Sequence, residues 1–205
     1  MKKILMIIAF LFVLPISGQR NKGILYFKDG TKKIGLAKIT SKKKIIFRKE
    51  KGSKKELYTY EDLDSVKITV KNWDYFITTT YCYKKTELNK YSLLKEIING
   101  KLSLYEKIGI NSGEDWTDMS TSDSGYYVWQ KRDEIAVLLA SYKHSDNLFS
   151  KKNKKAALRY FHDCPLLIKK IENNEFHTSI SPFGNNINNE KIIKKLVNYY
   201  NENCE

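Results

Sequence analysis

The strongest constraint on the fold is a series of short β-prone runs in residues 23–71, each followed by a turn signal. The first two runs flank Asp29-Gly30, a dipeptide that suits a tight hairpin turn because glycine accepts positive φ. KKIIFRKE, ELYTY and SVKITV follow, with a charged turn around Gly52 and one helical turn in EDLDS. Five short antiparallel strands at this spacing predict a strongly bent sheet or a small, partly closed β-barrel.

Residues 72–110 continue this β-rich region. WDYFITTTYCYKK predicts a strand because it is rich in aromatic and β-branched residues. TELNKYSLLKEIING predicts a helix whose apolar face ends at Gly100, and KLSLYEKI alternates apolar and polar residues as a strand does. We therefore expect residues 19–110 to form a sheet or small barrel with one helix. The apolar side chains of the expected helix are Leu93, Leu94, Ile97 and Ile98.

The remainder of the chain predicts a loop and then a mainly helical part. Residues 111–125 are rich in Ser, Asp and Gly, which favour a loop. Residues 126–205 begin with a strand, YYVWQK, and continue with an expected helix, EIAVLLA, preceded by Asp133. Ser150 can cap a further helix, Pro165 interrupts it, and EKIIKKLVNYYNENC is amphipathic. The prediction is an α+β fold: an N-terminal bent antiparallel sheet or small β-barrel, a mixed region, and a C-terminal helical segment.

The first 18 residues have the layout of a secretory signal peptide. Lys2 and Lys3 precede an apolar run that ends before Pro15, and small residues follow up to Gly18. The run is shorter than the roughly 20 residues that span a bilayer. We expect cleavage after Gly18 and export to the periplasm or the medium, with no membrane span thereafter; the alternative is an uncleaved N-terminal anchor. A lipoprotein is not expected, because no cysteine lies near the cleavage site.

The net charge of +14 is concentrated in residues 19–71. One interpretation is attraction to a polyanion such as an anionic glycan or a lipid surface. Nucleic acid is not expected as a partner of an exported protein. The other interpretation is compositional, because Lys, Asn, Ile and Tyr are all abundant, whereas Arg, the usual residue for bidentate phosphate contacts, is rare. The candidate polyanion-binding residues are Lys32, Lys33, Lys42, Lys43, Lys44, Lys54 and Lys55.

The chain has three cysteines. In an exported protein they are candidates for disulfides, because disulfides form and persist outside the cytoplasm. Cys164 sits at the break between two helical segments and Cys204 ends the last helix. A bond between them would close about 40 residues and add roughly 4 kcal/mol in the chain-entropy model. We favour this pairing and expect Cys82 to be buried in its strand as a small apolar residue.

The stretch FHDCP permits a second interpretation of Cys164, as an enzyme nucleophile. A cysteine nucleophile needs a base within hydrogen-bond reach. The adjacency of His162 does not favour such a pair, since neighbouring residues of a helix point roughly 100° apart. His144 and His177 are the other candidate bases, and a helix start at Pro165 would lower the thiol pKa. We assign no catalytic residue and keep the thiol enzyme as an alternative.

Metal and cofactor motifs are absent from the sequence. The three histidines form no zinc pattern, and the chain holds no glycine-rich nucleotide motif and no GxSxG nucleophile motif, so we expect no metal or cofactor. Asp115, Asp118 and Asp123 share a loop that would suit calcium or simply be solvated, and their spacing differs from an EF-hand. Aromatic residues interleaved with lysines are typical of surfaces that stack bases or sugars, and equally of a half-buried sheet.

Several motifs resemble those of uncharacterised secreted proteins of Bacteroidetes, particularly flavobacteria. They include LLKEIINGKLSLYE, YYV, KKAALRYFHDCPLLIKKIENNEF and IIKKLVNYYNENC. The matching positions in residues 23–66 are Gly23, Asp29, Gly30, Gly35, Ile39, Ile46, Phe47, Tyr58 and Asp62. The resemblance implies an exported protein with a disulfide-capped helical end and supplies no catalytic residue. Asp64-Ser65-Val66 also resembles the three-residue O-glycosylation signal of that phylum, which makes Ser65 a candidate site.

We expect an exported, non-catalytic protein of the cell envelope that binds another macromolecule or stabilises a surface assembly. The basis is the export signal, the scarcity of histidine and the lack of a catalytic pattern. The alternatives are a basic module that binds polyanions or lipid headgroups, and a thiol enzyme using Cys164.

Overall fold

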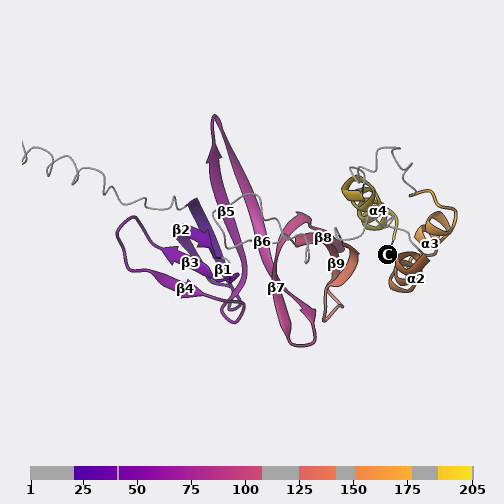
Figure 1. Ribbon diagram of the computed structural model, residues 1–205, viewed down its shortest axis with the longest axis horizontal. Helices are drawn as coiled ribbons and strands as arrows, with labels where there is room; N and C mark the ends of the chain where they lie inside the picture. Colours follow the sequence, from indigo (N-terminus) through magenta and orange to yellow (C-terminus); the bar gives the residue numbers. More distant parts are fainter. Residues whose placement is uncertain (1–20, 41, 108–124, 142–150, 177–188, 205) are drawn as a thin grey trace, which may run out of the picture.

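A computed structural model describes residues 21–40, 42–107, 125–141, 151–176 and 189–204. Across these ranges, ten strands form one antiparallel sheet, and three helices lie beside the C-terminal strands of that sheet (Figure 1). The strand order is β10-β9-β8-β7-β6-β5-β1-β2-β3-β4, so β10 and β4 are free edges. The α+β prediction is confirmed, and the small-barrel alternative is wrong because the sheet is open.

The sheet is a meander in which β1 lies between β5 and β2. The strands are β1 Asn21–Phe27, β2 Lys32–Ile39, β3 Ile45–Arg48, β4 Glu56–Tyr58, β5 Leu63–Asn72, β6 Tyr75–Glu87, β7 Lys90–Ile98, β8 Leu102–Lys107, β9 Gly125–Gln130 and β10 Val137–Ser141. The helices are α2 Lys151–Tyr160, α3 Pro165–Glu172 and α4 Asn189–Asn203.

The predicted β1–β2 hairpin is present and is closed by the expected turn. Gly30 adopts a φ of 85°, and the Asp29 carboxylate accepts hydrogen bonds from the backbone N–H and the hydroxyl of Thr31. Gly23 and Gly35 face each other across the two strands. A Cβ at Gly35 would lie 2.7 Å from the Phe47 ring, so the ring packs directly on the backbone of β2.

One face of the sheet carries two hydrophobic cores. The first core joins residues of β1, β2 and β3 to residues of β5, β6 and β7. Strands as distant in the sheet as β3 and β7 contribute to it. The sheet is bent, because the β2–β3 turn lies within hydrogen-bond reach of β6. The Tyr83 hydroxyl of β6 fixes this bend by donating to the carbonyl of Lys43 in the β2–β3 turn. The buried residues of the first core are Leu25, Ala37, Ile45, Phe47, Leu63, Val66, Ile68, Tyr83 and Leu93.

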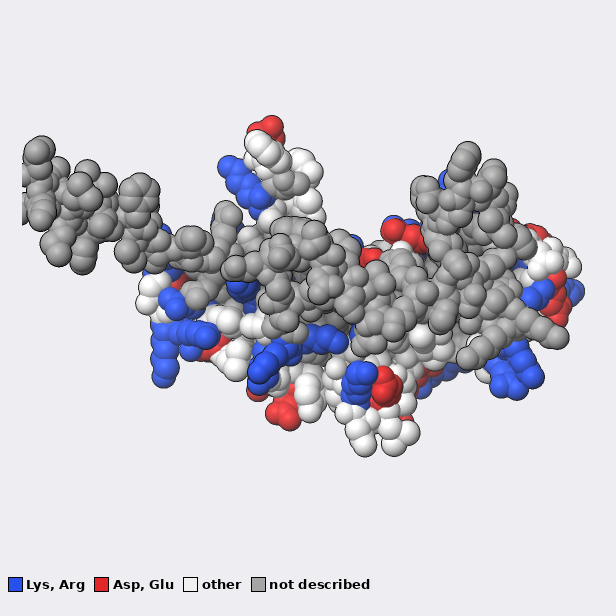
Figure 2. Space-filling model, in the orientation of Figure 1, with Lys and Arg blue, Asp and Glu red and all other residues white. Residues whose placement is uncertain are grey.

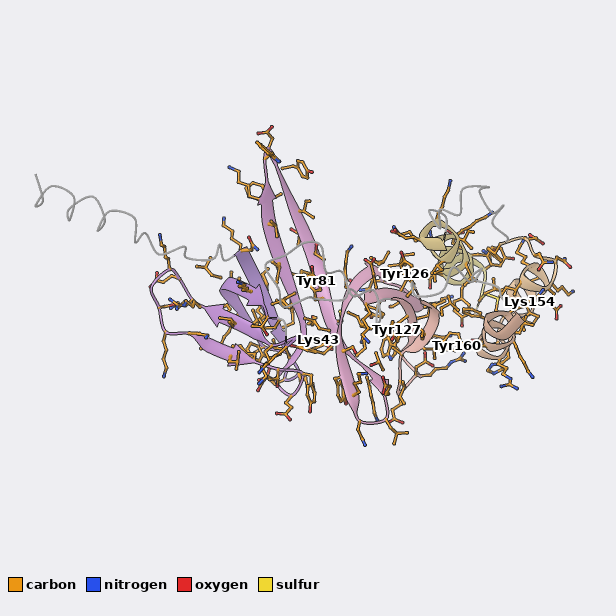
Figure 3. All side chains as sticks on the ribbon, in the orientation of Figure 1. Lys43, Tyr81, Tyr126, Tyr127, Lys154 and Tyr160 are labelled. Atoms are coloured by element: carbon orange, nitrogen blue, oxygen red, sulfur yellow. A yellow bond between two sulfur atoms is a disulfide. The ribbon has the colours of Figure 1, made fainter. Side chains whose placement is uncertain are left out.

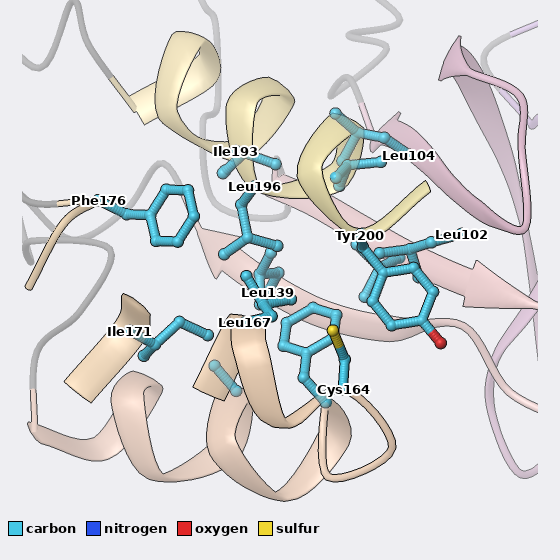
Figure 4. Close-up of a cluster of buried hydrophobic side chains, with 14 of the residues drawn as sticks. Leu102, Leu104, Leu139, Cys164, Leu167, Ile171, Phe176, Ile193, Leu196 and Tyr200 are labelled. Atoms are coloured by element: carbon cyan, nitrogen blue, oxygen red, sulfur yellow. The ribbon is translucent and has the colours of Figure 1, made fainter. Parts of the chain in front are cut away.

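The second core lies where the helices cover strands β8 to β10 (Figure 4). Leu102 and Leu104 of β8 pack against Ile193, Leu196 and Tyr200 of α4. The cluster is completed by Ala157 of α2, by Phe161 directly after α2, and by Leu167 and Ile171 of α3. The predicted C-terminal helical segment is therefore confirmed, with Pro165 as the first residue of α3.

Two predicted helices are strands. The segment around Leu93 and Leu94 forms β7, in which Leu93 packs in the first core and Leu94 in a third cluster on the opposite face. Because both faces of β7 are covered, its apolar residues are consecutive rather than alternating, a pattern that also fits a helix. Residues 137–140 of the segment EIAVLLA belong to β10, where Leu139 is buried and Leu138 is 48% exposed.

Other predictions fall outside the described residues: the signal peptide at residues 1–18, residues 111–124 of the predicted loop, and the cap at Ser150. None of the helices in the described part of the chain has the length and hydropathy needed to cross a membrane.

Candidate functional site

A cavity of about 360 Å³ opens on the face of the sheet opposite the helices. Alternation along β8 places Leu104 beneath the helices and Tyr105 on the cavity side. Strands β1, β5, β6, β7, β8 and β9 all contribute to its lining. The volume lies in the range of small-molecule sites, about 300–1,000 Å³.

The aromatic wall of the cavity is built from Tyr105 and Trp129, which pack with Cys82 in the third cluster. The Trp129 indole donates from Nε1 to the carbonyl oxygen of Asp133 at 2.9 Å, which fixes the orientation of the ring. Burial raises the pKa of the Tyr105 hydroxyl. Burial, reinforced by the nearby Glu96 carboxylate, raises the pKa of the Cys82 thiol to about 12. Cys82 is therefore protonated at neutral pH, as suits a buried apolar residue and not a nucleophile.

Three lysines line the cavity together with two carboxylates. The Lys84 Nζ lies 3.7 Å from the centroid of the Trp129 ring, and the Lys67 Nζ lies 5.6 Å from that of Tyr26. Among the described residues, neither of these two lysines nor Lys131 forms an ion pair with a carboxylate. The two acids of the lining are Asp64 and Glu96.

Ser65, the candidate glycosylation site, lies in the wall of this cavity. It belongs to β5, pairs in register with Cys82 of β6, and is 9% exposed. The folded chain therefore holds Ser65 on a central strand and not on an exposed loop, and a glycan attached there would fill the cavity. Thr80 and Ser103 bring further hydroxyl groups to the lining.

The β5–β6 hairpin projects beyond the rest of the sheet (Figure 1). Several exposed side chains at its end are apolar. Trp73, in the turn, is 88% exposed and adopts a φ of 47°, which is uncommon for a bulky residue. The five exposed apolar residues of this hairpin, which we call the hairpin tip, are Val70, Trp73, Tyr75, Phe76 and Ile77.

The hairpin tip presents apolar side chains on both faces of the hairpin. Val70 and Ile77 oppose each other on the face that also carries the buried Ile68, so they extend the first core outward as a stripe. Phe76 lies on the other face and is 66% exposed. The sequence pattern predicts strands for these residues, and their exposure is seen only in the structure. The available signal was KNWDY, in which the two-residue turn Trp73-Asp74 carries a bulky aromatic residue and joins two strands longer than their neighbours.

The seven candidate polyanion-binding lysines fall into two groups at opposite ends of β2 and β3. One group lies at the starts of β2 and β4 and consists of Lys32, Lys33, Lys54 and Lys55; the other is the β2–β3 turn at residues 42–44. About 20 Å of strand separates the groups. Lys33 also pairs with Glu56 at 2.7 Å. On the face in view, Figure 2 shows the basic side chains in separate groups and not as one patch.

The FHDCP stretch forms part of a disulfide link between the start of α3 and the end of α4, which we call the clasp. Cys164 and Cys204 are joined in a disulfide, with their Cα atoms 5.4 Å apart, and Cys164 is 3% exposed. Asp163 accepts a hydrogen bond from the Tyr200 hydroxyl at 2.6 Å and pairs with Arg132 at 2.7 Å. His162 is exposed, and the hydrogen-bond partner found for its ring among the described residues is the backbone oxygen of Arg159, at 3.1 Å from Nδ1. The structure therefore gives Cys164 no free thiol and no base.

A second link joins the helices to the sheet beside the clasp. The Tyr160 hydroxyl, which lies between the helices and β9 in Figure 3, donates to the Asp133 carboxylate at 2.5 Å. That carboxylate also accepts the backbone N–H of Gln130 at 2.8 Å. Asp133, expected to precede a helix, in fact organises the turn after β9.

Groups of three or more His, Cys, Asp or Glu residues that would hold a metal ion are not found within the described ranges. The loop of Asp115, Asp118 and Asp123 lies outside those ranges. No family model, curated protein or solved structure matches the chain. The resemblance to secreted Bacteroidetes proteins accordingly stays a prediction.

Proposed function

We propose that the protein is an exported, non-catalytic protein of the cell envelope that binds another protein through the hairpin tip. The observation that carries this proposal is the projection of five exposed apolar side chains on a single two-stranded hairpin. Aromatic residues of this kind are enriched in protein interfaces, where a few of them supply most of the binding energy.

The apex of the tip, Trp73, contributes little to the stability of its own fold. A two-stranded hairpin is marginally stable when it stands alone. Trp73 adds an unfavourable backbone conformation and contacts little of the chain, since 88% of it is exposed. A bulky aromatic residue in such a position is better explained by a contact with another molecule.

A protein partner is favoured over a lipid surface by the charge at the apex. Asp74 shares the turn with Trp73 and is exposed. An anionic headgroup layer would repel this carboxylate, and its insertion into the bilayer would be unfavourable. A protein surface can instead offer an apolar groove with a donor beside it. The polyanion-binding alternative has less support because its candidate lysines lie in two separated groups.

Site-specific photo-crosslinking tests the proposal. A photoreactive phenylalanine analogue replaces Phe76 of the hairpin tip in exported protein, and in a matched control it replaces Leu88 of the β6–β7 turn, which is 76% exposed. We expect a discrete protein adduct from position 76 in intact envelopes and none from position 88. The double substitution Trp73→Ser/Phe76→Ser should abolish capture of the same partner, whereas Leu88→Ser should not.

Three outcomes would contradict the proposal. Adducts that form equally at both positions would indicate non-specific contact. Adducts only with lipid would favour the headgroup-binding alternative. An adduct made solely of two copies of this chain would assign the tip to self-association. Circular dichroism of each variant establishes that the fold is retained.

A further inference from the structure

We infer that the cavity on the helix-free face binds a monoanionic acidic sugar, either free or as one unit of a glycan chain. This inference concerns a different surface from the hairpin tip and goes beyond the proposed function. It rests on the charge, the aromatic wall and the hydroxyl groups of the cavity lining.

Two of the three lysines of the cavity are held in place by aromatic rings without being neutralised. Lys84 lies over two aromatic rings, at 3.7 Å from the Trp129 centroid and 5.7 Å from that of Tyr105. A cation above a ring is attracted by the ring quadrupole yet keeps its full charge. The same arrangement holds Lys67 over Tyr26. Both ammonium groups are therefore positioned to donate to the carboxylate of a ligand, a charge-assisted hydrogen bond that is stronger than a neutral one.

The carboxylates of the lining limit the charge of the ligand. Three lysines and two acids leave an excess of one positive charge around the cavity. A ligand with a single negative charge balances this excess, whereas a densely sulfated or phosphorylated chain would face repulsion from Asp64 and Glu96. The two acids are then free to accept hydrogen bonds from neutral hydroxyl groups.

The remaining lining suits a polyhydroxylated ring. Ser65, Thr80 and Asn99 supply side chains that both donate and accept hydrogen bonds. In the aromatic wall, Trp129 is fixed in orientation by its bond to Asp133 and keeps the Lys84 ammonium beside these groups. Since the volume is at the small end of the range for ligand sites, we expect the cavity to hold one or two sugar rings.

Isothermal titration calorimetry on the exported chain tests this inference. The probes are D-glucuronate, D-galacturonate and a galacturonate oligomer, with D-glucose as the neutral control. Lys84→Met removes the central ammonium but retains the length of the side chain. The matched control is Lys28→Met, because Lys28 lies over the Tyr91 ring at 5.8 Å but outside the cavity.

We expect saturable binding of at least one acidic probe, weaker at raised salt, and about tenfold weaker for D-glucose and for Lys84→Met. Lys28→Met should bind like the unmodified chain, and so should the Trp73→Ser/Phe76→Ser variant, which separates this site from the proposed function. Binding of the oligomer alone assigns the site to a glycan chain, and binding of the monosaccharides assigns it to a free sugar.

The inference is overturned if no acidic probe binds, if D-glucose binds as well as the acids, or if Lys28→Met weakens binding as much as Lys84→Met. Should Lys84→Met fail to fold, Lys67→Met removes the other ring-held ammonium of the cavity and takes its place, with the same expected loss.

Discussion

At the scale of single residues, the Tyr200 hydroxyl connects the last helix to two other elements. It donates to the Asp163 carboxylate at 2.6 Å, and the Gln130 side-chain oxygen lies 3.3 Å away. Burial, together with the Asp163 carboxylate, raises the pKa of Tyr200 to about 12. Burial likewise raises the pKa of Tyr83, in the first core, to about 12. Both hydroxyls are therefore held in the protonated form by the fold.

These shifts predict a loss of stability at alkaline pH. An unfolded tyrosine ionises near pH 10, so the stabilisation is complete below that pH and is lost as the pH rises from about 10 to about 12. Thermal melting followed by circular dichroism should show a falling midpoint across this window. Tyr200→Phe should melt lower at neutral pH but lose less stability on alkalisation. Parallel pH curves for the two proteins would contradict the assignment to Tyr200.

Cys82 gives a second prediction at this scale. The thiol is 6% exposed and its pKa is raised to about 12, so the reactive thiolate is scarce at neutral pH. Without reductant, the native protein should resist alkylation, and the denatured protein should gain one label per chain, at Cys82. Mass spectrometry of labelled peptides reads the result. Labelling of Cys164 or Cys204 without reductant would show that the clasp does not form.

At the scale of elements, the sequence predicts strands well where turns and alternation agree. The β1–β2 hairpin was found because Asp29-Gly30 stands between two β-prone runs. Strand β7 was missed because Leu93 and Leu94 belong to cores on opposite faces of the sheet. A sequence alone does not reveal that both faces of a strand are covered, since the covering residues come from distant segments.

Gly23 of β1 lies close to Ala37 of β2, a contact that can be recognised only when the pairing of these two strands is known. A Cβ added there would lie 2.4 Å from the Cβ of Ala37 in β2. Gly23→Ala should therefore destabilise the protein by about 1–3 kcal/mol, as overpacking of a core does. Urea unfolding measures the change. The double variant Gly23→Ala/Ala37→Gly exchanges the two methyl groups and should recover part of the loss; no recovery would place the cause in the backbone and not in this contact.

At the scale of the whole molecule, one continuous sheet connects two separate cores. The cavity is assembled from strands distributed between β1 and β9, and its lysines at positions 67, 84 and 131 are far apart in the chain. No local motif marks such a site, which is why sequence analysis did not find it. The Cys164–Cys204 pairing could be predicted because it depends on two local features, a helix break at Pro165 and a helix end at the last cysteine.

The C-terminal end of α4 makes several of the polar contacts that attach the helices to the sheet. The Asn201 side chain donates to the carbonyl oxygen of Leu102 at 3.0 Å and accepts the N–H of the same residue at 2.8 Å. The Lys101 ammonium donates to the carbonyl oxygen of Cys204 at 2.9 Å. The disulfide holds the same end against the start of α3. All of these contacts involve residues 201–204, at the C-terminal end of α4.

Loss of the disulfide should therefore loosen the two cores unequally. Cys164→Ser/Cys204→Ser removes a bond that closes 40 residues, worth about 4 kcal/mol in the chain-entropy model. Hydrogen exchange should rise most in α2 to α4 and in β8 to β10, because these elements form the second core. Exchange in β1 to β3 should change less, because the first core and the Tyr83–Lys43 bond do not involve the helices. Equal acceleration throughout the sheet would mean that the two cores unfold as one cooperative unit.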